Sequence, residues 1–385
     1  MVKLKDICTI NPKAPTLSDD MLVSFVPMPK VGENGEFDPT DTREYGTVKK
    51  GFTSFQNGDV LFAKITPCME NGKGAIARSL VNGYGFGSTE FHVLRPNSDM
   101  VTSEWLYYLM SWTEFRKNAE SNMTGSAGQK RVPKSFLEQY EINLPGIEEQ
   151  GRITNQLDAL TNLISLRNEQ LAKLDELVKA RFVEMFGTIH DNKLCYEIKT
   201  LQDVCEQIKD GTHQTPTYTD DTVNGYKFLS SKDVTTGKID WSHLKYIPEE
   251  LHNELYARIA PQKGDVLLAK NGTTGIAAIV DRDEIFDIYV SLALLRPIDV
   301  ESVYLWAAIN SAETKHQFDA SLKGIGVPNL HLGEIKKAKI LIPPIDEQKK
   351  FATFVNQTDK TKLTIQASLD KLEVMKKALM QEYFG

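Results

Sequence analysis

The sequence has few cysteines and no long apolar segment. Its four cysteines, Cys8, Cys68, Cys195 and Cys205, form no Cys-x-x-Cys pair, so neither a zinc site nor any other metal site is expected. No apolar run approaches the roughly 20 residues of a membrane-spanning helix, and the first residues contain no apolar signal core. We therefore expect a cytoplasmic protein with reduced thiols and no membrane contact.

An excess of basic charge is also missing. The 385 residues include 45 Lys and Arg against 52 Asp and Glu, for a net charge of −7. Nucleic-acid-binding domains usually carry a basic balance, so composition alone argues against a nucleic-acid binder.

The common catalytic motifs are absent as well. The chain lacks a G-x-x-x-x-G-K-[ST] phosphate loop, an H-E-x-x-H zinc motif and a G-x-S-x-G nucleophile turn, and it lacks the Asn-Pro-Pro-aromatic motif of base methylation. Two Glu-x-Lys triplets, at 197–199 and 334–336, have the spacing of some nucleases but no convincing upstream aspartate. A single-chain DNA nuclease or methyltransferase therefore remains an alternative without a supporting motif.

The sequence does contain an internal repeat. Segment 144–150, Leu-Pro-Gly-Ile-Glu-Glu-Gln, returns at 342–348 as Ile-Pro-Pro-Ile-Asp-Glu-Gln. The 40 residues 148–187 align without a gap with the 40 residues 346–385, and both end in Phe-Gly. Shorter matches occur upstream in the same order: 4–8 with 201–205, Gly-Asp-Val-Leu at 58–61 and 264–267, Leu-Arg-Pro at 94–96 and 295–297, and Val-Pro at 132–133 and 327–328. The chain is therefore one design used twice.

The two 40-residue segments are predicted to be long helices. Apolar residues follow the three-four spacing of a coiled-coil seam, and a proline precedes each start. The seam residues are Leu157, Leu160, Ile164, Leu171, Leu174, Val178, Val355, Ile365, Leu369 and Leu372. Forty helical residues extend roughly 60 Å, and a helix of that length with one apolar seam needs a partner. A two-fold relation between the repeats predicts an antiparallel coiled coil.

The remaining segments are predicted to be mixed α/β domains. Short apolar strands are expected at 60–64, 91–95, 266–270 and 292–296. One helix is expected in each half, at 103–118 and at 302–318, with a serine as N-cap and its aromatic residues in the core. The fold class is α+β. Two pseudo-symmetric domains, 1–147 and 188–345 (with a linker at 188–195), alternate with helices at 148–187 and 346–385.

This combination resembles the specificity subunit of Type I restriction–modification systems over essentially the whole chain. The resemblance implies that the globular segments are target recognition domains, each reading one half of a bipartite, non-palindromic site in double-stranded DNA. It implies that the helices are spacers that set the gap between half-sites and dock two methyltransferase subunits, which carry S-adenosylmethionine. A motor–nuclease subunit would join for cleavage, and this chain would be non-catalytic and bind no cofactor.

Candidate DNA-contacting residues are polar or basic residues in the loops that recur in both halves. Such side chains read base edges or bind phosphates. Those of the first half are Lys30, Lys64, Thr66, Asn71, Lys73, Ser126, Gln129, Lys130 and Arg131. Those of the second half are Lys209, Thr212, His213, Gln214, Ser231, Lys232, Lys270, Asn271, Thr273, Thr274, Lys323, Asn329 and His331. Lys64 and Lys270 stand out because each follows the same Gly-Asp-Val-Leu strand.

Two alternatives stay open at this point. One is the single-chain enzyme, and the other is a coiled-coil interaction protein that does not bind DNA. No segment of the chain is strongly basic, so if it does read DNA, it should bind weakly alone. Most of the phosphate charge would then be neutralised by the methyltransferase partners.

Overall fold

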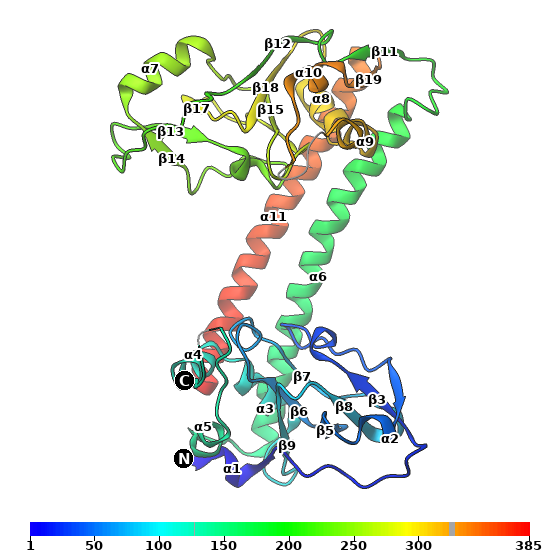
Figure 1. The fold of residues 1–385 in the computed structure, drawn as a ribbon, viewed down its shortest axis with the longest axis vertical. Helices are drawn as coiled ribbons and strands as arrows, with labels where there is room; N and C mark the ends of the chain where they lie inside the picture. The colour runs from blue at the N-terminus through cyan, green and yellow to red at the C-terminus, as the bar shows by residue number, and fades with distance from the viewer. Residues whose placement is uncertain (127, 323–327) are drawn as a thin grey trace. The chain divides into compact units, whose positions relative to one another are not determined.

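The chain folds as two compact units. The computed structural model describes residues 1–126, 128–322 and 328–385. Unit 1 comprises Met1–Asn168 and Ala367–Gly385, and unit 2 comprises Glu169–Gln366 (Figure 1). Each unit therefore contains one globular half together with a part of both long helices.

The long helices are α6, Ile147–Phe186, and α11, Ile345–Phe384, each of 40 residues. Both begin and end one residue earlier than predicted. Gly187 terminates α6 with a positive φ of 71°, a conformation that glycine adopts without steric cost, and its amide bonds to the Val183 carbonyl.

The two helices pack antiparallel within each unit, as the repeat predicted. In unit 1, Leu157 near the start of α6 packs with Met380 near the end of α11. In unit 2, Phe182 near the end of α6 contacts Phe351 near the start of α11, with ring centroids 5.5 Å apart. All ten predicted seam residues are buried or half-buried.

Each unit is built around a four-stranded antiparallel sheet, and the two sheets have the same strand order. In unit 1 the order is β2–β9–β6–β7, and in unit 2 it is β12–β18–β15–β16. The bounds are β2 Cys8–Ile10, β6 Val60–Ala63, β7 Gly74–Ile76, β9 Phe91–Pro96, β12 Cys205–Asp210, β15 Val266–Ala269, β16 Ala277–Ile279 and β18 Leu292–Pro297. All four predicted apolar strands are present in these sheets.

A second sheet in each unit differs more between the halves. Unit 1 has the order β4–β3–β8–β5 and unit 2 the order β14–β13–β17. The strands are β3 Leu22–Val26, β4 Thr42–Glu44, β5 Thr53–Gln56, β8 Tyr84–Gly87, β13 Tyr226–Leu229, β14 Lys245–Ile247 and β17 Phe286–Ile288. In unit 2 a ten-residue helix, α7 (Glu249–Arg258), comes between β14 and β15, where unit 1 has α2 (Tyr45–Val48) and β5. Short 3₁₀ turns are η1 Met28–Lys30, η2 Val81–Gly83 and η3 Ser231–Val234.

The helices of each globular half are shorter than predicted. The single helix expected at 103–118 is two helices, α3 Ser103–Ser111 and α4 Thr113–Ser121, because Trp112 adopts an extended conformation. The helix expected at 302–318 likewise divides into α8 Ser302–Ile309 and α9 Ala312–Ser321. The N-caps are Thr102 and Glu301, not the predicted serines. The aromatic residues are core residues as expected: Trp105 and Tyr304 are each 1% exposed.

The ends of each globular half are joined by a two-stranded ribbon. In unit 1, β1 (Val2–Lys3) pairs with β10 (Glu141–Ile142), and in unit 2, β11 (Glu197–Thr200) pairs with β19 (Lys339–Ile342). Short helices lie next to these strands: α1 Leu4–Ile7, α5 Lys134–Gln139 and α10 Leu332–Lys337.

The Gly-Asp-Val-Leu and Leu-Arg-Pro motifs form one structural ion pair in each unit. The buried Asp59 carboxylate accepts bonds of 2.8 and 2.7 Å from the Arg95 guanidinium, and a third from the Gln56 amide. Asp265 and Arg296 repeat this arrangement at 2.9 and 2.8 Å. These motifs therefore link the strands of the main sheet in each unit.

The glutamine of the Pro-x-Ile-x-Glu-Gln step fixes the start of each long helix. The buried Gln150 amide donates to the Met100 and Pro145 carbonyls at 2.8 and 2.9 Å and accepts from the Thr102 amide at 2.9 Å. Gln348 is 1% exposed and repeats two of these bonds. Its side-chain amide donates to the Pro343 carbonyl and accepts from the backbone N–H of Glu301, the N-cap of α8. The motif thus ties each helix to the globular half before it.

Candidate nucleic-acid interface

The loops predicted to read DNA leave the same end of the main sheet in both units. Because β6 and β9 are antiparallel, with Ala63 opposite Phe91, the segment after β6 and the segment before β9 meet there. Lys64 donates its backbone N–H to the Glu90 carbonyl at 2.9 Å. In unit 2, Lys270 makes the same bond to Ser291 at 2.8 Å. The sequence repeat therefore placed these two lysines at equivalent positions.

The equivalence drawn for the Val-Pro loop was wrong by three residues. Val132 donates its N–H to the Lys64 carbonyl at 2.9 Å, and in unit 2 the donor to the Lys270 carbonyl is Leu330, at 2.9 Å. Leu330 therefore matches Val132, although the sequence alignment paired Val132 with Val327. A two-residue match in a loop of unequal length does not determine the register.

The loop after β6 is held in shape by two cations. The buried Arg116 guanidinium donates to the Met69 carbonyl at 2.7 Å and to the Gly72 carbonyl at 2.8 Å. Burial lowers the pKa of Arg116 to about 10, so it stays charged at neutral pH. Lys73 donates to the Val31 carbonyl at 3.0 Å. The Arg116 guanidinium also lies over the Phe62 ring, 5.3 Å from its centroid, so carbonyl bonds and a cation–π contact together hold this loop against β6.

The charged groups next to Lys64 pair with one another and not with Lys64. The Arg131 guanidinium forms two bonds of 2.9 and 2.8 Å with the Glu90 carboxylate, and these bonds lower the pKa of Glu90, with a smaller contribution from Lys64. Lys64 itself is half-buried, and no described carboxylate forms an ion pair with it. The neighbouring His92 has its pKa lowered by burial and bonds to the Val132 carbonyl at 2.8 Å. Lys64 therefore remains a candidate for contact with an external acceptor.

Unit 2 uses the equivalent lysine differently. Lys270 is 5% exposed, and its ammonium lies 2.7 Å from the Asp210 carboxylate. His213 lies 3.2 Å and Arg258 3.3 Å from the same carboxylate, and both side chains are exposed. Hydrogen bonding to Lys270 lowers the pKa of Asp210 against the opposing effect of burial, which is the largest single influence. A positioning role fits Lys270 better than a direct DNA contact.

The other predicted contact residues differ in exposure. Exposed ones are Asn71, Ser126, Gln129, Lys130, Lys209, His213, Gln214, Lys232, Thr273 and His331. Half-buried ones are Lys30, Lys64, Thr66, Lys73, Arg131, Ser231, Asn271, Thr274 and Asn329. Thr212 and Lys270 are buried, and Lys323 lies outside the described residues.

Backbone bonds bring many of these residues together. In unit 1, the Thr66 amide bonds to the Lys130 carbonyl at 3.1 Å, which joins the loop after β6 to the basic 128–131 segment. In unit 2, Asn271 and Asn329 form an isolated β-bridge. Lys30 forms local ion pairs with Asp38 and Asp41, at 2.9 and 3.0 Å, which raise its pKa through hydrogen bonding.

A family model decides which class of protein this is. The Type I restriction modification DNA specificity domain matches residues 1–176 and matches again at residues 195–374. The chain belongs to this family.

Relatives of this family share part or most of the chain. The specificity subunits of the Type I restriction enzymes EcoAI and EcoEI of Escherichia coli are each 42% identical, over 200 and 201 residues. These matches cover 51% of this chain and 33% of each relative, so the chain matches about a third of their length. The MjaVIII specificity subunit of Methanocaldococcus jannaschii is 25% identical over 318 residues, covering 77% of this chain and 72% of the relative.

Solved structures show the same fold. A chain from a structure on complex assembly and conformational transition of the Type I system superposes with a TM-score of 0.61 at 20% identity, covering 99% of this chain and 96% of that one. The S subunit from M. genitalium gives a TM-score of 0.57 at 13% identity, covering 100% and 95%.

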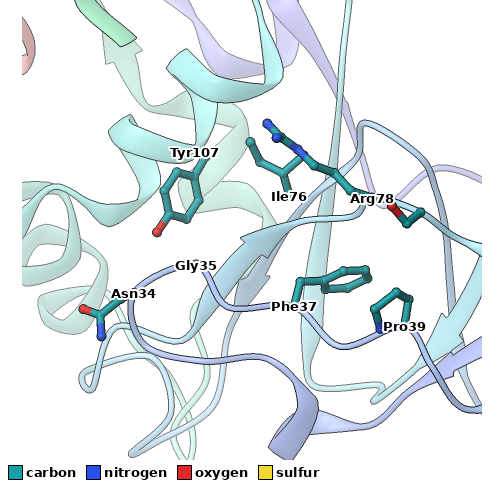
Figure 2. A pocket seen from close by; sticks show the side chains of 8 residues that line it. Asn34, Gly35, Phe37, Pro39, Ile76, Arg78 and Tyr107 are labelled. Carbon is teal, nitrogen blue, oxygen red and sulfur yellow. The ribbon is translucent and has the colours of Figure 1, made fainter. Parts of the chain in front are cut away.

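A cavity of about 340 Å³ in unit 1 is lined by residues that include Phe37, Arg78 and Tyr107 (Figure 2). Arg78 lies 2.6 Å from the Glu104 carboxylate, and burial raises the pKa of Tyr107 to about 12, so neither is a ready acid or base. No group of three or more His, Cys, Asp or Glu is placed to hold a metal in residues 1–126, 128–322 and 328–385.

Other sequence features have structural explanations. In the Glu-x-Lys triplets, Lys199 pairs with Glu197 at 3.1 Å, and Glu334 pairs with Lys337 at 3.2 Å. Burial raises the pKa of the Cys8 and Cys205 thiols to about 12, so both stay protonated. Across the part of the chain that the structure describes, no helix is long and apolar enough to cross a membrane.

Sequence reasoning missed Arg116, Asp210 and Arg258. Arg116 lies within a segment predicted only as a helix, and its acceptors lie 44 and 47 residues away. Arg258 lies in the ten-residue helix α7, which the sequence pattern did not predict. The sequence did contain one signal for Arg258: it is a basic residue in the last turn of a helix that precedes the Gly-Asp turn.

Proposed function

We propose that this chain is the DNA-specificity subunit of a Type I restriction–modification complex. The observation that carries the proposal is that one framework, used twice, presents different loops at the same end of two matching sheets. Each globular half then reads one half of a split, non-palindromic site. The loops around Lys64 and Lys130 would act for unit 1, and those around His213 and Asn271 for unit 2. The domain limits at 1–147 and 188–345 belong to this proposal.

The long helices would set the distance between half-sites and dock two methyltransferase subunits. Both helices keep large apolar side chains in solvent, which supports a docking role. Leu166 is 54% exposed on α6 and Leu363 is 69% exposed on α11. The partners would carry S-adenosylmethionine and the methylation chemistry, and a motor–nuclease subunit would cut DNA. The specificity chain supplies no catalytic group and works with them in the cytoplasm.

Reconstitution tests the proposal. The chain and its cognate methyltransferase subunit are purified and combined, and methylated motifs are mapped by long-read sequencing of a plasmid library. The complex is expected to methylate one split motif, and each component alone is expected to methylate nothing. Methylation by this chain alone would favour the single-chain enzyme. A complex that forms without salt-dependent, sequence-specific DNA binding would favour the coiled-coil interaction protein.

The role of the helices has its own test. An insertion of four residues within 163–170 lengthens α6 by about 6 Å. The mapped motif should keep both half-sites and change only the number of unspecified bases between them. A changed half-site with unchanged spacing contradicts the division of roles between loops and helices.

A further inference from the structure

At the sheet end of unit 2, one carboxylate faces more positive charge than it can neutralise. Asp210 is surrounded by Lys270 at 2.7 Å, His213 at 3.2 Å and Arg258 at 3.3 Å. The short bond to the buried Lys270 already balances the single negative charge. The charge on the exposed Arg258 guanidinium is therefore largely uncompensated.

The Arg258 guanidinium is nevertheless held in place. Its Nη2 donates to the Asp210 carbonyl at 3.0 Å, and its Nη1 lies 3.4 Å from the Gly211 carbonyl. The Arg258 carbonyl in turn accepts a bond of 3.4 Å from the Lys209 ammonium. The Arg258 side chain is 47% exposed, so part of its donor fork faces solvent. Two cations and a histidine thus share one patch of surface, which we call the Arg258 patch (Lys209, His213 and Arg258).

Helix α7 is anchored so that its last residue reaches this patch. One turn and a half earlier, the buried His252 pairs through Nδ1 with the Asp287 carboxylate of β17 at 2.7 Å. The Tyr226 ring stacks on His252 with centroids 3.7 Å apart and planes 8° apart. An anchored helix holds a terminal arginine with little freedom left to lose on binding, which favours a specific contact.

We propose that the Arg258 patch binds a phosphate of the DNA backbone, with Arg258 as the main contact. Arginine with a fixed, partly exposed fork matches the geometry of a phosphate, and backbone contacts of this kind set the register of a protein on the duplex. The proposal rests on the proposed function, because it takes DNA as the ligand. It also distinguishes the halves: in unit 1, Arg131 is paired with Glu90, and the half-buried Lys64 has no ion pair with a described carboxylate.

The test measures how salt weakens DNA binding by the assembled complex. Two duplex probes are used. One contains the motif that methylation mapping identifies, and in the other both half-sites are scrambled. Each phosphate contact contributes about 0.9 to the slope of log affinity against log salt. Arg258→Gln should therefore lower the slope by about 1 and the affinity about eightfold at 0.1 M salt, equally for both duplexes.

Two further variants separate binding from folding. Arg282→Gln is the matched control, because Arg282 is 50% exposed, pairs with Asp281 and follows β16 at the opposite end of the same sheet. It should leave the slope unchanged. Arg258→Lys keeps the charge but not the fork, so the slope should stay near the wild-type value. If Arg258 had only a structural role, Arg258→Lys would weaken DNA binding as much as Arg258→Gln does.

The outcomes are distinct. An unchanged slope in Arg258→Gln, or the same loss in Arg258→Lys, overturns the phosphate contact. A loss confined to the specific duplex also overturns it and assigns Arg258 to a base. If the wild-type complex does not bind the motif duplex more tightly than the scrambled one, the proposed function itself fails, and the phosphate contact fails with it.

Discussion

Replacing Gln150 by leucine tests whether the start of α6 depends on one buried side chain. Leucine is close to glutamine in size but makes no hydrogen bond. The change leaves the Thr102 N–H and the carbonyls of Met100 and Pro145 without their partner. A buried polar group without a partner costs about 1–3 kcal/mol, and leucine regains part of this by apolar burial. We expect Gln150→Leu to lower the unfolding free energy by about 3–5 kcal/mol.

The repeat provides an internal comparison. Gln348 makes two such bonds where Gln150 makes three, so Gln348→Leu should cost less, about 2–3 kcal/mol. Urea unfolding followed by tryptophan fluorescence measures both losses, and hydrogen exchange of the amides at 147–154 localises the first. Gln150→Glu keeps the acceptor but points a carboxylate at two carbonyls, so it should be at least as damaging as leucine. The reasoning is refuted if Gln150→Leu unfolds within about 0.5 kcal/mol of the wild type, the range of ordinary surface changes.

Three other predictions follow from buried groups. Phe186→Ala should cost about 3–5 kcal/mol because Phe186 is 1% exposed, and the half-buried Phe384→Ala should cost clearly less; equal losses in urea unfolding would contradict this order. Arg116→Met should speed hydrogen exchange in 66–73 and weaken methylation at sites matching the unit 1 half-site, whereas unchanged exchange would remove Arg116 as the support of that loop. Burial raises the pKa of Asp287 from 3.8 to about 6, so the unfolded chain releases this proton at lower pH than the folded chain. The free energy of unfolding should therefore fall by up to about 3 kcal/mol as pH rises from about 4 to about 6. Asp287→Asn should abolish that part of the fall, and identical pH profiles of the two proteins would show that Asp287 does not titrate this way.

The framework could be predicted from sequence because its signals are local and repeated. The forty-residue helices, their antiparallel packing and the four apolar strands all follow from spacing that both halves share. The break at Trp112 could not be predicted, because helical spacing continues through it and no capping side chain marks the start of α4. Tertiary structure overrides propensity at such positions.

The site was predictable only as a set of loops. Lys64 and Lys270 occupy equivalent backbone positions, yet Lys64 is half-buried without an ion pair to a described carboxylate, and Lys270 is buried against Asp210. The difference lies in a partner 60 residues away along the chain, which no spacing rule reveals. Arg258 was missed for the same reason. Its charge is largely uncompensated because Lys270 already neutralises the Asp210 carboxylate, and this arrangement cannot be seen from spacing.

The ribbons that join the ends of each globular half bear on how such chains change over time. Because Val2 lies opposite Ile142, and Glu197 opposite Ile342, each half enters and leaves the framework at one point. Because the two ends of each globular half lie side by side, the half can be replaced without a change in the long helices. Recombination that exchanges everything between the two strands of a ribbon would give a chain with one new half-site and the old spacing. Under the proposed function, exchange of such a whole segment would therefore change one half-site in a single step.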